Sequence, residues 1–160
     1  MTKTITKQIE VYSFDELSKD AKRNVSQWVH QYGYFWMEES VQSVKSFCDE
    51  FGVKVKNYEI GLWGHSYINT DAENNHFRGF TKAQAMAMRE KMPTGYCLDC
   101  TLFYTFADNF DKGALVAFND AIDAAVKDIL SDMESQESDE YLSEHCEANS
   151  YEFDVNGKIV

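Results

Sequence analysis

The spacing of the apolar residues changes along this chain, and the order of those changes limits the folds it can adopt. Over residues 17–32 and 37–51 apolar side chains recur every three to four positions, which predicts two amphipathic helices, each followed by a glycine. Over residues 53–68 the spacing falls to two, which predicts two strands joined near residues 61–64. The first half of the chain is therefore expected to contain a helix pair followed by a strand pair.

The rest of the chain shows the same two kinds of pattern. Ser13 with Glu16, and Thr81 with Gln84, have the capping-box spacing, and Ser18 is a further candidate cap. The remaining predicted elements are a strand over residues 7–14, a helix over 81–92, a long strand over 98–106, a helix over 115–133 and a C-terminal hairpin with an Asn156-Gly157 turn.

This order of elements does not alternate as βαβ units would, which favours an α+β fold over a doubly wound parallel sheet. We expect a small, mostly antiparallel sheet with three to four helices packed on one face. Pro93 is the only proline, and no Gly/Ser-rich stretch interrupts the apolar pattern. The sequence therefore predicts a single domain over residues 1–160.

The opening residues contain no apolar core of a signal peptide, and nowhere do eighteen apolar residues follow one another. We therefore expect a protein of the cytosol. The four cysteines, Cys48, Cys97, Cys100 and Cys146, are expected to be reduced thiols in that compartment.

The net charge of −12 is concentrated in the last third of the chain. Residues 1–100 contain twelve Lys and Arg against thirteen Asp and Glu, whereas residues 101–160 contain three against fourteen. Such a surface repels nucleic acid and anionic membranes and attracts basic protein surfaces. Direct binding to DNA, RNA or membrane is therefore not expected.

The segment "SDMESQESDEYLSEHCE", residues 131–147, has seven carboxylates and no lysine or arginine. It either continues the preceding helix or forms another. On a helix, Asp128, Asp132 and Asp139 lie near one stripe, and a second stripe contains Glu137, Glu140, Glu144 and Glu147. Neighbouring like charges at this spacing destabilise a helix by about 0.2–0.5 kcal/mol per pair. Solubility is one reason to keep them; imitation of the phosphate backbone, which would occupy a basic groove of a nucleic-acid-binding protein, is a sharper one.

The aromatic run "YGYFWMEES", residues 32–40, cannot be buried by a single helix face. Exposed Tyr, Trp and Met are enriched at the energetic centres of protein interfaces. This run is therefore a candidate partner surface, and it is compatible with a homodimer. Packing between helices is the alternative.

Two groups of residues are candidates for a catalytic, redox or metal site. Cys97 and Cys100 have a C-x-x-C spacing but fall in a predicted strand, where residues three apart point to opposite faces. Buried or half-buried thiols are therefore favoured over a metal or redox site. The stretch from His65 to Arg78, which includes His76, gathers residues capable of acid–base chemistry in a pattern that matches no catalytic or metal motif. The sequence predicts no catalytic residue, metal or cofactor.

The N-terminal "IEVYSFDELSKDAKRNVSQW" and the C-terminal "EANSYEFDVNGKIV" resemble the two ends of small proteins encoded by bacteriophages and prophages. Those proteins share a strand, F-D-E-L-S, an A-K helix ending in Trp and a closing N-x-Y-x-F with a glycine turn. The resemblance covers about thirty residues at one end and fourteen at the other. It implies a phage context and a host cytosol and carries over no functional residue. Phage proteins of this size that are acidic and lack catalytic motifs are similar in kind to anti-CRISPR and anti-restriction inhibitors.

The leading hypothesis is a non-enzymatic inhibitor that binds a basic nucleic-acid-binding surface of a host defence complex. The alternatives are a small enzyme or metal-dependent protein using the His65–Arg78 stretch, and an antitoxin-like partner of one toxin. The expected contact residues are the acids Asp128, Asp132, Glu137, Asp139, Glu140, Glu144 and Glu147, with Tyr34, Phe35 and Trp36 as a hydrophobic anchor.

Overall fold

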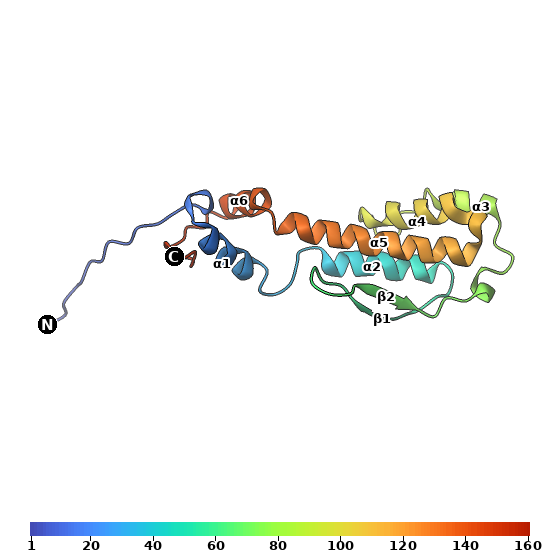
Figure 1. Cartoon of the computed structure of the whole chain (residues 1–160), viewed down its shortest axis with the longest axis horizontal. Helices are drawn as coiled ribbons and strands as arrows, with labels where there is room; N and C mark the ends of the chain where they lie inside the picture. Colours follow the sequence, from blue (N-terminus) through green and yellow to red (C-terminus); the bar gives the residue numbers. More distant parts are fainter. The chain divides into compact units, whose positions relative to one another are not determined.

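The computed structural model describes residues 1–160. The chain forms six α-helices, three short 3-10 helices and one two-stranded antiparallel sheet, and the predicted α+β class is confirmed (Figure 1). In order, the elements are η1 (Phe14–Glu16), α1 (Lys19–Val29), α2 (Met37–Asp49), β1 (Val55–Glu59), β2 (Tyr67–Thr70), η2 (Asn74–Phe77), α3 (Lys82–Met88), α4 (Leu98–Asn109), η3 (Phe110–Lys112), α5 (Ala114–Gln136) and α6 (Asp139–Ala148).

The chain divides into two compact units. Unit 1 consists of Met1–Phe35 and Ser135–Val160, and unit 2 consists of Trp36–Glu134. Each unit has buried apolar residues of its own. The expectation of a single domain stays a prediction.

The core of unit 1 lies between α1, α6 and the two ends of the chain. Its buried residues are Phe14, Leu17, Ala21, Val25, Leu142, Cys146 and Phe153. Phe153 forms isolated antiparallel bridges with Tyr12 and with Ile159. The predicted strand over residues 7–14 and the predicted C-terminal hairpin are thus reduced to single bridges around Phe153, although the turn at Gly157 is present with a φ of 80°.

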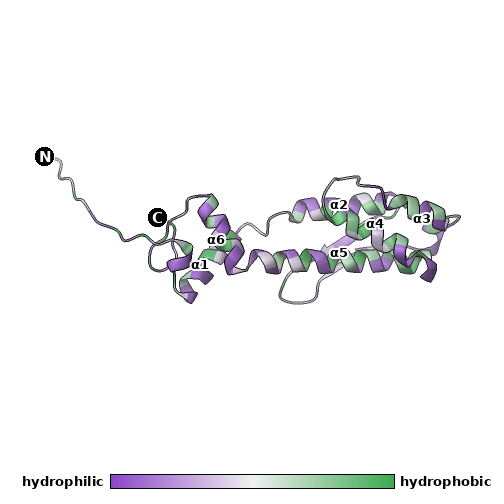
Figure 2. Ribbon diagram, turned by 90° about the horizontal axis from the view of Figure 1, so that it is seen from above, coloured by the Kyte–Doolittle hydropathy of each residue, from purple (hydrophilic) through white to green (hydrophobic).

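The core of unit 2 is built from phenylalanines of α2, η2, α4 and α5. The Phe47 ring lies 5.1 Å from that of Phe103 and 5.2 Å from that of Phe118, and all three side chains are fully buried. Figure 2 shows hydrophobic residues along α2, α4 and α5, interspersed with hydrophilic ones. The predicted strand pair is confirmed as β1 and β2, which pair antiparallel.

The long strand predicted over residues 98–106 is wrong, because this stretch is helix α4. In a strand, Leu98, Leu102 and Phe106 would share one face, because residues an even number apart point the same way. They are also four apart, which places them on one face of a helix. The helix buries Phe103 as well, which a strand pattern would have placed on the other face. Tyr104, counted as inward in the strand pattern, is 41% exposed.

The predicted caps are present. Ser18 Oγ accepts from Ala21 N and begins α1, and Thr81 Oγ1 accepts from Gln84 N and begins α3. Gly52 follows α2 with a φ of 67°, in the left-handed region that favours glycine. None of the helices combines the length and the apolar character needed to cross a membrane.

Candidate functional site

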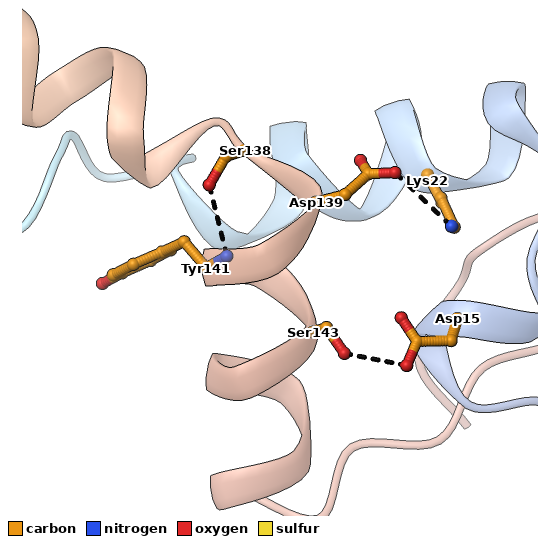
Figure 3. A network of polar contacts seen from close by, with 6 residues as sticks. All are labelled: Asp15, Lys22, Ser138, Asp139, Tyr141 and Ser143. Atoms are coloured by element: carbon orange, nitrogen blue, oxygen red, sulfur yellow. Dashed lines mark hydrogen bonds and ion pairs between the residues drawn. The ribbon is translucent and has the colours of Figure 1, made fainter.

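The acidic segment forms the end of α5 and the whole of α6, so it is two helices. The break between them falls at Glu137 and Ser138, and Ser138 Oγ caps α6 by accepting from Tyr141 N at 3.2 Å. Polar contacts join α6 to the N-terminal part of unit 1: Lys22 Nζ lies 3.5 Å from Asp139 Oδ2, and Ser143 Oγ donates to Asp15 Oδ2 at 3.0 Å (Figure 3).

The outer face of α6 carries three carboxylates that have no partner within the chain. Leu142 and Cys146 are buried in the core of unit 1, whereas Glu140, Glu144 and Glu147 are exposed. Their spacing of four and then three places these glutamates on one stripe of the helix. No side chain of the protein forms an ion pair or hydrogen bond with any of them. We name these three residues the α6 acidic stripe.

Glu137, a predicted contact residue, is exposed and also accepts two hydrogen bonds within unit 1. Its carboxylate accepts from Ser26 Oγ at 2.6 Å and from Tyr34 Oη at 2.5 Å. Burial acts to raise the pKa of Glu137, but the hydrogen bonds from Ser26 and Tyr34, together with the electrostatic influence of His30, outweigh it, so the pKa is lowered. Burial, followed by the hydrogen bond to Glu137 and its negative charge, raises the pKa of Tyr34 to about 12.

Phe35 is also engaged within unit 1. Its backbone N–H donates to Gln136 Oε1 at 2.9 Å, and its carbonyl accepts from Gln136 Nε2 at 3.0 Å. The Phe35 ring lies 5.2 Å from that of His145 and 5.9 Å from that of His30, and the His30 ring stacks on Tyr34. Of the predicted anchor, Tyr34 and Phe35 therefore pack against their own unit.

Trp36, Asp128 and Asp132 line one groove in unit 2, which we name the Trp36 groove. Its volume is about 470 Å³, and its walls come from the start of α2, residues 95–101 and the last third of α5. The Trp36 side chain is 64% exposed. Asp128 accepts a hydrogen bond from Thr101 Oγ1, which joins α5 to α4 at the groove wall. The structure thus brings together three residues predicted as contacts from distant parts of the sequence.

The wall of the Trp36 groove is fixed by a buried carboxylate that the sequence reasoning missed. Asp99 is fully buried, and it accepts from Thr94 N at 3.0 Å, from Thr94 Oγ1 at 2.9 Å and from Gly95 N at 3.0 Å. Thr94 Oγ1 also contacts Ser43 Oγ of α2 at 2.9 Å. These bonds position the backbone that carries Tyr96 into the groove. The signal was a Thr-Gly pair followed by an Asp in the first helical turn, which the strand interpretation concealed.

Some residues of the alternative His65–Arg78 centre take part in local backbone structure. His65 lies in the loop before β2 and His76 in η2 after it, so β2 separates them. Asp71 Oδ1 accepts from Lys54 N at 2.7 Å, and His76 Nδ1 accepts from Glu73 N at 2.9 Å. No group of three or more His, Cys, Asp or Glu side chains in the chain could hold a metal ion.

Cys97 and Cys100 lie at the start of α4, with Cys97 in the N-cap position, and not in a strand. They do not point to opposite faces of a strand, and Cys97 is exposed where a buried or half-buried thiol was expected. All four cysteines are free; Cys97 is exposed and lines the Trp36 groove, whereas Cys48 and Cys146 are buried. Burial raises the pKa of Cys48 to about 12 and that of Cys146 to about 11.

Comparison of the chain with protein-family models, curated proteins and solved structures finds no match.

Proposed function

We propose that this protein is a non-enzymatic inhibitor that binds a basic, nucleic-acid-binding surface of another protein through its acidic surface. The proposed target is a host defence complex of the CRISPR or restriction type, met in the host cytosol. This context is the one implied by the resemblance of the two chain ends to phage proteins.

The observation that carries the proposal is the α6 acidic stripe. Its three carboxylates are exposed and unpaired, on a helix whose opposite face is anchored in the core of unit 1. No lysine or arginine occurs between Lys127 and Lys158, so no neighbour along the chain neutralises them. Unpaired charges of one sign on a rigid element cost stability without forming an internal contact, and they attract a surface of opposite charge.

The proposal is tested in bacteria that carry a CRISPR or restriction system and are challenged with a sensitive phage. Expression of the wild-type protein is expected to raise the number of plaques. Reversal of the stripe in the triple variant Glu140→Lys, Glu144→Lys and Glu147→Lys is expected to abolish the rise.

The matched control reverses three exposed acids of unit 2 that line no part of the Trp36 groove: Glu59→Lys, Glu90→Lys and Asp123→Lys. It changes the net charge equally, so it should keep the wild-type effect. Equal plaque numbers with and without the protein in every defence background would contradict the proposal. If the stripe variant raised plaque numbers as much as the wild type does, the α6 acidic stripe would not carry the inhibition.

A further inference from the structure

We infer that the Trp36 groove is a receptor for an arginine side chain presented by the protein partner. This inference rests on the proposed function, because it names the chemistry of the partner at a second site on unit 2. The occupant is a basic protein segment, with the guanidinium between the aromatic and acidic walls.

The lining of the groove contains the two kinds of group that bind a guanidinium. Trp36 and Tyr96 provide aromatic surface, and Glu39, Asp128 and Asp132 provide carboxylates. The lining residues include no lysine, arginine or histidine. A planar guanidinium stacks on aromatic faces and hydrogen-bonds carboxylates with two parallel N–H groups, which the ammonium of lysine cannot do.

The same pairing already occurs elsewhere in unit 2. The Arg89 guanidinium lies 4.8 Å from the centroid of the Tyr104 ring, and its Nη1 donates to Asp108 Oδ1 at 2.9 Å. One arginine is thus held between an aromatic face and a carboxylate on the surface of α4. The lining of the Trp36 groove includes both of these kinds of group.

The backbone holds Trp36 where a partner can reach it. Trp36 is the N-cap of α2 with a φ of 66°, a left-handed conformation that bulky residues rarely adopt. Its carbonyl nevertheless accepts from Ser40 N at 2.9 Å, so the first turn of α2 is fixed on it. The exposed indole is therefore carried by the hydrogen-bonded start of a helix and not by a free loop.

The test is an NMR titration of the full chain with an Arg-Gly repeat peptide, following the three indole N–H resonances. Binding is expected to shift the Trp36 resonance and to leave that of Trp63 in place; Trp63 is 94% exposed and serves as the internal control. Asp128→Asn with Asp132→Asn is expected to weaken binding by about tenfold. Trp36→Ala is expected to weaken it as much, and because this variant lacks the reporting indole its binding is followed by the alkylation of Cys97. Asp123→Asn, also exposed on α5, should bind as the wild type does.

A second readout does not depend on any variant. Because Cys97 lines the groove, the bound peptide is expected to slow its alkylation by iodoacetamide. A Lys-Gly repeat peptide that shifts Trp36 equally would overturn the arginine assignment. Equal shifts of the Trp36 and Trp63 indole resonances would show that the peptide does not bind specifically in the groove. Unchanged peptide affinity in Asp128→Asn with Asp132→Asn would likewise contradict the groove as the binding site.

The two proposals fail in different ways. If stripe reversal abolishes inhibition of defence while Trp36→Ala keeps it, and the peptide does not bind the groove, the arginine receptor is wrong and the proposed function stands. If the peptide binds the groove but the stripe variant raises plaque numbers as much as the wild type does, the arginine receptor is supported and the stripe does not carry the function.

Discussion

Ser26 Oγ lies 2.6 Å from Glu137 Oε2, and this hydrogen bond ties α1 to the break between α5 and α6. Ser26 is buried, so its hydroxyl relies on that carboxylate as its partner. Glu137, a predicted contact residue, thus also has a role in the fold of unit 1. In the helix that follows, the three carboxylates of the α6 acidic stripe have no such partner.

Replacement of Glu137 is expected to destabilise unit 1. Glu137→Ala leaves the Ser26 and Tyr34 hydroxyls without their acceptor, which should cost about 1–3 kcal/mol of unfolding free energy. Glu137→Gln keeps one acceptor oxygen and should cost less. Urea unfolding measures both variants, with the unpaired Glu144→Gln as the control. A loss in Glu137→Ala no larger than in Glu144→Gln would show that the network contributes nothing.

The stability of unit 1 should fall in acid. The pKa of Glu137 in the folded protein lies below its ordinary value of 4.5, so the unfolded chain binds the proton more readily. The contribution is complete above the unfolded pKa and is lost as the pH falls through the folded one. Urea midpoints measured from neutral to acidic pH should decline less steeply for Glu137→Gln than for the wild type. Parallel curves would contradict this assignment.

Gly157 should tolerate no side chain. A Cβ at this position would lie 2.3 Å from the backbone oxygen of Ala21, and the φ of 80° is unfavourable for alanine. Gly157→Ala is expected to cost about 2–4 kcal/mol, from backbone strain and displacement of α1 together. Gly79→Ala has a similar φ of 78° with nothing within 4 Å, so it isolates the strain alone. Equal losses of unfolding free energy in the two variants would show that the close approach to Ala21 is unimportant.

The cysteines should react with iodoacetamide in an order set by exposure. Cys97 is exposed and should be alkylated first at neutral pH, whereas Cys48 and Cys146 are buried and have raised pKa values. Peptide mass spectrometry of samples quenched over time measures the order, and the urea-unfolded protein is the control in which all four react. Labelling of Cys48 as fast as Cys97 in the folded protein would contradict the packing of α2.

The helices with clear caps could be predicted from the sequence, because Ser18 and Thr81 each precede an apolar pattern of helical period. The prediction of a strand at α4 was wrong because the spacing of Leu98, Leu102 and Phe106 fits both a strand and a helix. The burial of Phe103, on the other face of a strand, is what distinguishes the two. The C-terminal hairpin was predicted too long, because a turn signal fixes where a chain reverses but not how many bridges follow.

The acidic residues of the candidate site could be found from composition, but their roles could not. Glu137 and Glu140 are three residues apart in the same acidic run, yet one is held by Ser26 and the other has no partner. That difference depends on α1, more than a hundred residues away in sequence. Likewise, Trp36 and Asp128 share a groove only because α2 and α5 pack in one unit.

The most direct test of the central claim is capture of partners by the immobilised full chain from a lysate of defence-competent bacteria, at low and then high salt. The wild type and the Glu59, Glu90 and Asp123 reversal control are expected to retain the same nucleic-acid-binding protein in stoichiometric amount and to release it at high salt, because exposed charges are screened there. The stripe reversal variant is expected to retain none. Equal retention by the stripe variant, or retention that salt does not weaken, would contradict binding through the α6 acidic stripe.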